Sequence, residues 1–94
     1  MLSKKNFYIN GKWVIPHQEK ELHVINPSTE ESCAIISLGS SEDINSAVSA
    51  AKKAFESWAF TSKEERLKLL ESLYSLYKKR WNEMAEAISL EMGA

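Results

Sequence analysis

The sequence predicts an α/β segment in which short strands come first and three α-helices follow. Two observations predict this order. Val, Ile, Tyr, Phe, Asn and both prolines are concentrated before about residue 40, whereas Ala, Leu, Glu and Lys dominate after it. Beyond residue 40, apolar residues recur at the spacing of a helix rather than of a strand. With 94 residues, the chain is expected to form one domain or less.

The first predicted element is a hairpin in the stretch FYINGKWV. Asn10 and Gly11 separate two β-prone pairs, and both residues tolerate the positive φ that a type I′ turn requires. Strands are therefore expected at 7–9 and 12–14.

A second pair of strands is predicted around the stretch LHVINPSTEE. Pro27 lacks an N–H donor and biases Asn26 away from helix, so a strand at 22–25 should end and turn there. The apolar stretch that follows is expected to return as a strand at 32–37. All predicted strands thus lie within about 7–37.

The first helix is predicted at about 41–57. Either Ser40 or Ser41 can cap it, and Glu42 and Asp43 place carboxylates at its positive end. Its apolar residues lie on one stripe that is expected to be buried: Ile44, Ala47, Val48, Ala51, Ala54, Phe55 and Trp58.

The second helix is predicted at about 62–80. Ser62 and Glu65 have the spacing of a capping box, and the cations of 78–80 lie where the negative helix end favours them. The apolar face continues through Leu67, Leu70, Leu73, Tyr74 and Tyr77.

A third, shorter helix is predicted at about 82–92. Asn82 is the expected N-cap, and Gly93 suits the left-handed residue that ends a helix. Met84, Ala85, Ile88 and Met92 share one face.

Composition and charge disfavour several classes of partner. The 12 Lys and Arg nearly balance the 13 Asp and Glu, which disfavours nucleic acid. No apolar run approaches the ~20 residues of a membrane helix or the ~7 of a signal-peptide core, so membrane insertion is not expected. The single cysteine, Cys33, excludes an internal disulfide and favours a reducing compartment, so the chain is expected to be cytoplasmic.

Few residues of the sequence are candidates for catalysis or for binding a metal or a phosphate. Cys33 lies in an apolar strand without a helix N-terminus or a basic neighbour to activate it, so a core or half-buried thiol is expected rather than a nucleophile. His17 and His23 lack a third ligand or a nearby acid and are expected to be solvated. The three glycines form no phosphate-binding loop. The aromatic residues at helical spacing are expected in a core or an interface: Phe55, Trp58, Phe60, Tyr74, Tyr77 and Trp81.

Four stretches, in this order and spacing, resemble the start of the NAD(P)-dependent aldehyde dehydrogenases. They are YINGKWV, VINPSTEE, ISLGSSEDINSAVSAAKKAFESWAFTSKEERLKLL and AEAISLEMGA. Each is weak alone, because Asn-Gly and Asn-Pro are common turns. Together they cover nearly the whole chain.

The resemblance implies that residues 1–94 are the N-terminal part of a Rossmann-type cofactor-binding domain and not a complete domain. Family members oxidise an aldehyde to a carboxylic acid with NAD(P)⁺, through a thiohemiacetal and a thioester on a catalytic cysteine. The resemblance places that cysteine and the cofactor-binding segments in parts that this chain lacks. Cys33 does not match the catalytic position. The 94-residue chain is therefore expected to have no catalytic residue, to bind no NAD(P) and to be inactive alone.

One site of the family could reach into this segment. The resemblance places two carbonyl ligands of a structural monovalent cation at Val24 and Ile25, with the acidic ligand elsewhere. Many relatives carry a hydroxyl residue where Val24 stands, so only main-chain oxygens could serve here, and ordinary strand backbone is the competing interpretation.

Two hypotheses about function follow. In the first, the chain is the leading part of an aldehyde dehydrogenase, and its helices pack on the remainder of that enzyme. In the second, it is a stand-alone helical module that forms a homo-oligomer or binds a protein partner through its aromatic stripes.

Overall fold

The computed structural model describes residues 1–94 and has the predicted order of strands followed by three helices. None of the helices combines the length and the apolar character needed to cross a membrane. The elements are β1 (Leu2–Lys4), β2 (Phe7–Ile9), β3 (Lys12–Val14), β4 (Glu21–Asn26), β5 (Glu31–Ser37), α1 (Ser41–Trp58), α2 (Lys63–Lys79) and α3 (Trp81–Met92).

The strands form two separate sheets. β2 and β3 make an antiparallel hairpin in which Asn10 and Gly11 both have positive φ, 54° and 76°, as the type I′ turn requires. β4 and β5 are the second antiparallel pair, and β1 adds to the other edge of β5 in parallel. The sequence analysis missed β1, because three residues without an alternating pattern become a strand only once β5 offers an edge.

The helix starts follow the capping signals in part. Ser40 is the N-cap of α1. At α2, the Ser62 hydroxyl accepts a hydrogen bond from the Glu65 N–H (3.1 Å), but the Glu65 carboxylate accepts none from the Ser62 N–H, so the predicted capping box is half formed.

The predicted Asn82 cap is wrong, because α3 begins at Trp81. Arg80 ends α2 by donating its N–H to the carbonyls of Leu76 and Tyr77, and its own carbonyl then accepts from Met84. A single residue therefore separates the two helices, and no room remains for a polar cap side chain.

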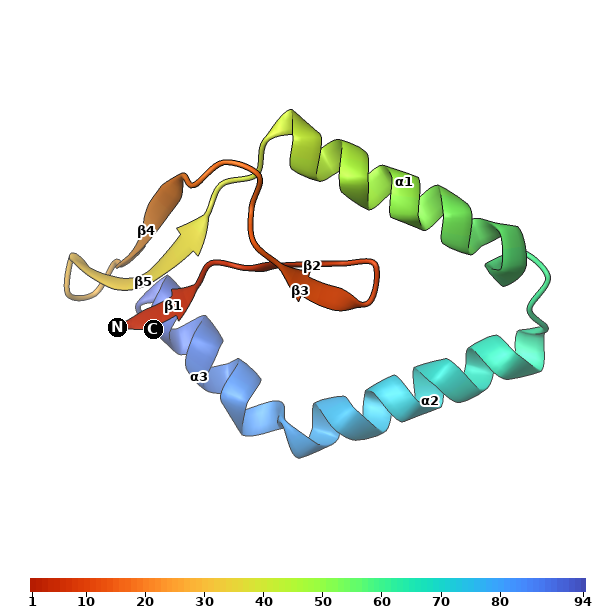
Figure 1. Ribbon diagram of the computed structural model, residues 1–94. Coiled ribbons are helices and arrows are strands. Elements are labelled where there is room, and N and C mark those ends of the chain that lie inside the picture. Colours follow the sequence, from red (N-terminus) through yellow and green to blue (C-terminus); the bar gives the residue numbers. More distant parts are fainter.

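The three helices and the β1-β5-β4 sheet surround a central opening, and we call this arrangement the frame (Figure 1). The β2-β3 hairpin points into the opening. The radius of gyration is 17.0 Å, whereas a compact chain of this length is expected at about 12 Å. The frame is therefore expanded, with extents of 48 × 34 × 16 Å.

The frame leaves its apolar residues in contact with solvent. The accessible surface is 8132 Å² and none of the 94 residues is buried, whereas a compact monomer of this mass exposes about 5,500 Å². The predicted burial of the first helix's stripe is wrong for this chain, since Phe55 is 64% exposed. The apolar face of α2 is exposed as well, with Leu70 at 62%. Helical periodicity shows which face prefers to be covered, but the covering surface is not among these residues.

Candidate functional site

Cys33 lies at an irregularity of the second sheet. Val24 pairs with Ala34 while Ile25 pairs with Ser32, so Cys33 is the extra residue of a β-bulge. Its side chain is half-buried, and its Sγ donates a hydrogen bond to the Val24 carbonyl (3.4 Å). A thiol held in this way has no base beside it, which is the arrangement of a structural cysteine rather than a nucleophile.

The bulge brings the two candidate cation ligands to the same place. A bulge interrupts the ladder of backbone hydrogen bonds, and this one falls between Val24 and Ile25. The Val24 oxygen is engaged by the Cys33 thiol, a contact that the sequence analysis did not predict. No group of three His, Cys, Asp or Glu side chains assembles here or elsewhere in the chain.

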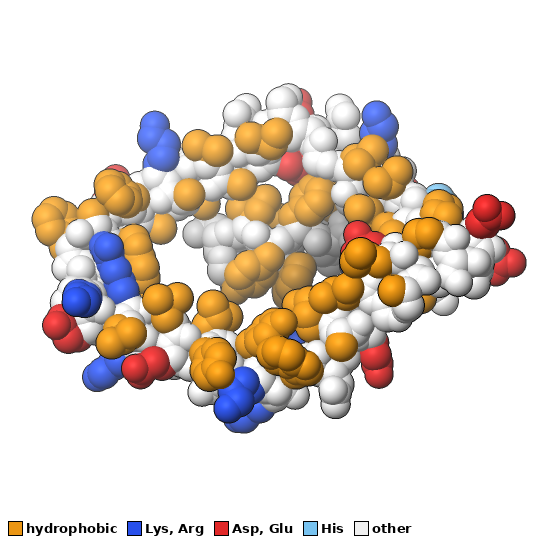
Figure 2. Space-filling view, turned by 180° about the vertical axis from the view of Figure 1, so that it is seen from behind, with side chains coloured by type: hydrophobic (Ala, Val, Ile, Leu, Met, Phe, Trp, Pro, Cys, Tyr) orange, Lys and Arg blue, Asp and Glu red, His pale blue; other side chains and the backbone are white.

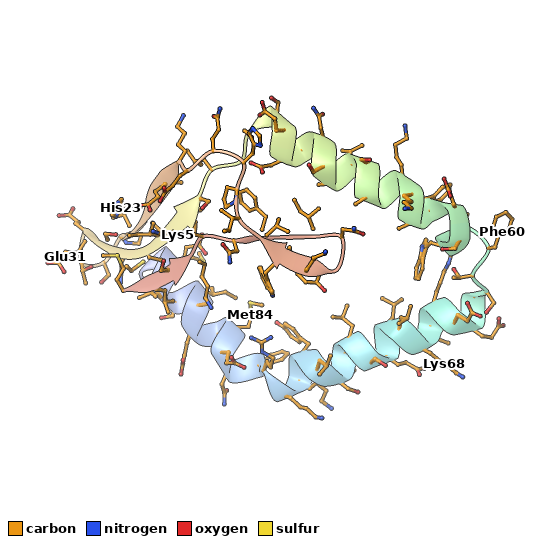
Figure 3. The ribbon with its side chains drawn as sticks, viewed as in Figure 1. Lys5, His23, Glu31, Phe60, Lys68 and Met84 are labelled. Atoms are coloured by element: carbon orange, nitrogen blue, oxygen red, sulfur yellow. The ribbon has the colours of Figure 1, made fainter.

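The two histidines are exposed and make separate contacts. The Nδ1 atom of His23 lies 3.0 Å from the Ser32 hydroxyl across the β4-β5 pair (Figure 3). His17 uses only its backbone, whose N–H donates to Asp43 Oδ1 at 2.9 Å. The structure therefore does not bring the histidines together.

The N-terminus of α1 is the one place where a strand leads through a glycine, Gly39, into a helix, as phosphate-binding turns do. Here carboxylates occupy it: Asp43 Oδ2 accepts from the Ser40 N–H and the Ser40 hydroxyl, both at 3.0 Å. Hydrogen bonds from the backbone of Ser40 and then of His17 hold the pKa of Asp43 below its usual range.

The neighbouring carboxyl adds to this charge. A backbone hydrogen bond lowers the pKa of Glu42, so both acids are ionised near neutral pH. Two negative charges at the helix end would repel the phosphates of a dinucleotide. This turn therefore presents negative charge where a phosphate-binding turn presents free backbone N–H groups.

A groove lies in the angle between α2 and α3, and sequence reasoning did not predict it. We call it the elbow groove. Its volume is about 390 Å³, and Met84 points from α3 toward the central opening (Figure 3). Its lining residues are Leu73, Leu76, Tyr77, Arg80, Glu83, Met84 and Ala87.

The charges of the elbow groove compensate each other. Arg80 Nε lies 3.0 Å from Glu83 Oε2. This pairing raises the pKa of the Arg80 guanidinium and lowers the pKa of the Glu83 carboxyl. The remaining lining is apolar, and the Tyr77 and Trp81 rings meet edge to face at 5.3 Å beside it. Such a groove is suited to apolar side chains rather than to an ion.

A second assembly fixes the corner where α1 meets α2. The Arg66 guanidinium donates to Thr61 Oγ1 (2.8 Å) and to the Trp58 carbonyl (3.1 Å), and it lies 5.4 Å from the centre of the Trp58 ring. Phe60, at the same corner, is 88% exposed and points away from the opening (Figure 3). The Arg66 contacts therefore stabilise the angle between the two helices.

Apolar side chains gather on the parts of the frame that border the opening (Figure 2). The β2-β3 hairpin and α1 meet there, where Tyr8 and Ile9 lie opposite the alanines Ala47, Ala50, Ala51 and Ala54. The frame thus offers an extended apolar surface that none of its own residues covers.

Comparisons with known proteins agree with one another. The sequence profile described as "Aldehyde dehydrogenase family" matches residues 13–94. A 3-succinoylsemialdehyde-pyridine dehydrogenase from a Pseudomonas species is 46% identical over 94 residues, which are 100% of this chain and 20% of that protein. The chain thus spans about a fifth of the length of the curated relatives it matches.

Solved structures show the same shape. An aldehyde dehydrogenase from Bartonella henselae superposes with a TM-score of 0.98 at 54% identity, over 100% of this chain and 20% of that one. Aldehyde dehydrogenase C from Pseudomonas syringae, solved as a mutant with NAD⁺ and octanal, gives 0.93 at 43% identity, over 96% of this chain and 19% of that one. With its strands followed by three helices, the chain belongs to the aldehyde dehydrogenase family.

Proposed function

We propose that this chain forms the N-terminal part of the Rossmann-type cofactor-binding domain of an NAD(P)-dependent aldehyde dehydrogenase. In that enzyme an aldehyde would be oxidised to a carboxylic acid. One observation carries the proposal: the whole chain, frame and opening included, superposes at a TM-score of 0.98 on 20% of a solved aldehyde dehydrogenase. Structures of this family solved with NAD⁺ support the choice of cofactor.

The 94-residue chain is proposed to be inactive alone and to bind no NAD(P). The basis is the chemistry of its residues, since Cys33 donates to a backbone carbonyl and carboxylates occupy the α1 N-terminus. Calorimetric titration with NAD⁺ is expected to give no saturable heat. Stoichiometric binding would overturn this part of the proposal.

A chimera tests the proposed function directly. The aligned first fifth of the Bartonella henselae enzyme is replaced by residues 1–94, which are 54% identical to it. We expect a folded protein that reduces NAD⁺ in the presence of an aldehyde, because the apolar surface of the frame would be covered as in that relative. The control is the same enzyme without its first fifth. A folded but inactive chimera would contradict the proposal.

We also propose that the carbonyls of Val24 and Ile25 contribute to a monovalent cation site in the complete enzyme. The bulge between them supports this, while the Cys33 thiol competes for the Val24 oxygen. Replacing Cys33 with Ala in the chimera should therefore strengthen stabilisation by K⁺ relative to choline. An unchanged response would argue for ordinary strand backbone.

Self-association is the competing proposal for the same apolar surface, although the family match does not favour a stand-alone module. Homo-oligomers would form through Ala47, Val48, Ala51, Phe55, Leu70, Leu73, Tyr74 and Tyr77, most of which are exposed. Sedimentation of the 94-residue chain decides: Phe55→Asp or Leu70→Asp should dissociate an oligomer, whereas Lys52→Asp should not. A compact monomer would refute it.

A cytoplasmic location is proposed from the single, unpaired cysteine.

A further inference from the structure

We propose that Met1 and His23 form a binding site for a soft monovalent cation of the Cu⁺ class, on the β1-β5-β4 sheet. The ligands are the thioether Sδ of Met1 and the imidazole Nδ1 of His23, and the Ser32 hydroxyl contacts both. The proposed function assigns no role to any of these three residues.

Three neighbouring strands bring these side chains together. Met1 directly precedes β1, Ser32 lies on the central strand β5, and His23 lies on the outer strand β4 (Figure 3). The Ser32 Oγ lies 3.0 Å from His23 Nδ1 and 3.7 Å from Met1 Sδ. The sheet thus gathers a nitrogen donor and a sulfur donor around one oxygen.

The Ser32 hydroxyl faces more acceptors than it can satisfy. Its Oγ also lies 3.5 Å from the Ala34 carbonyl oxygen. A hydroxyl has one hydrogen to donate and a thioether has none, and His23 donates from Nδ1 in only one of its neutral tautomers. In the other tautomer the hydroxyl satisfies one acceptor, so the ring nitrogen, the sulfur or both keep a free lone pair. Such lone pairs are available to a cation.

The donor set selects the class of ion. A thioether is a soft, polarisable ligand that favours Cu⁺, and imidazole also suits copper, whereas Mg²⁺ and Ca²⁺ prefer oxygen ligands. His23 belongs to no group of three His, Cys, Asp or Glu side chains. Structural zinc sites take four such ligands, so this pair does not suit Zn²⁺.

Solvent has access to the pair, and one ligand can adjust its position. Met1 is 76% exposed, the His23 side chain is exposed and Ser32 is half-buried. Bonds from a metal ion to nitrogen and sulfur are about 2.0–2.3 Å long, which is shorter than the present distances from the hydroxyl oxygen. Methionine has three rotatable bonds, so its sulfur can reach an ion beside His23 without a change in the sheet.

Titration of the 94-residue chain with Ag⁺ tests the site, because Ag⁺ is soft like Cu⁺ but stable in air. Each protein carries Cys33→Ala, since a thiol is itself a ligand for soft ions. Each is released from a fusion by a protease, so that residue 1 can be varied. We expect saturable 1:1 binding, with NMR shifts confined to the Met1 methyl group and the His23 ring. Comparable shifts of the other methionines or the other histidine, or the absence of saturation, would overturn the proposal.

Matched variants identify the ligands. Met1→Leu and His23→Gln should each weaken Ag⁺ binding at least tenfold. Met92→Leu and His17→Gln remove the same groups elsewhere in the chain, where Met92 is 68% exposed and His17 is exposed, and should leave the affinity unchanged. Equal losses in the controls would overturn the assignment. Ser32→Ala keeps both ligands and removes the competing hydroxyl, so it should bind Ag⁺ at least as tightly, and weaker binding would also overturn it.

Competition with hard cations separates this site from the carbonyl site proposed at Val24 and Ile25. A large excess of K⁺ or Mg²⁺ should leave the Ag⁺ affinity unchanged, because neither ion competes for a thioether. Displacement of Ag⁺ by K⁺ would show that carbonyl oxygens bind the ion and would contradict the assignment to Met1 and His23. Neither result depends on whether the chimera oxidises an aldehyde.

Discussion

Replacing Gly93 with Ala tests whether the end of α3 packs tightly on the β4-β5 turn. Gly93 has a φ of 74°, and a Cβ built on it would lie 2.7 Å from the Ser28 backbone nitrogen and 3.3 Å from two atoms of Pro27. The left-handed conformation costs an L-residue about 1–2 kcal/mol. Relieving the clash by a backbone shift adds about 1–3 kcal/mol.

Gly11 is the matched control. Its φ is 76°, but nothing lies within 4 Å of an added Cβ. Gly11→Ala therefore carries only the conformational cost of about 1–2 kcal/mol, confined to the β2-β3 hairpin. The difference between the two variants measures the contact between α3 and the turn.

Amide hydrogen exchange by NMR on the 94-residue chain is the assay. The reporter is the Glu30 N–H, which bonds to the Asn26 carbonyl at 2.8 Å in the turn that the new methyl group would displace. At tenfold per 1.4 kcal/mol, the clash of about 1–3 kcal/mol with the turn predicts exchange at least roughly fivefold faster in Gly93→Ala. Gly11→Ala should leave this amide unchanged. Similar exchange at Glu30 in both variants would refute a close contact between α3 and the turn.

Three further predictions follow from single contacts. Arg66→Ala should broaden the distance distribution between spin labels on α1 and α2, because the hydrogen bonds to Thr61 and Trp58 are lost. An unchanged distribution would show that these bonds do not determine the angle between the two helices. The lowered pKa of Asp43 means that its folded form binds a proton less readily than the unfolded chain does. The ionised Asp43 carboxylate therefore contributes its full share to folding stability at pH values above 3.8, the ordinary pKa of this carboxyl. That contribution is lost as the pH falls through the lower pKa of the folded form. Acid titration followed by circular dichroism should show this loss, and Asp43→Asn should remove that component; an identical acid transition in both would contradict the reasoning. Cys33 should react slowly with thiol reagents, because it is half-buried and donates to a carbonyl, and reaction at the rate of a free, exposed thiol would contradict this.

The sequence by itself determined the features that depend on neighbouring residues. The Asn10-Gly11 turn followed from two residues that tolerate positive φ, and the end of α3 followed from Gly93 in the left-handed region. The start of α1 followed from Ser40 and the acids after it. These signals act within a few residues of each other, so they can be recognised without knowledge of the rest of the fold.

Only the tertiary structure decided which faces are covered and which residues meet across the chain. The parallel pairing of β1, the bulge that joins Cys33 to the Val24 carbonyl, and the elbow groove all depend on elements distant in sequence. The stripes on α1 and α2 were read correctly as apolar, yet they are exposed here. An apolar pattern records a preference for burial, whereas burial itself requires a second surface, and periodicity along one chain holds no information about where that surface lies.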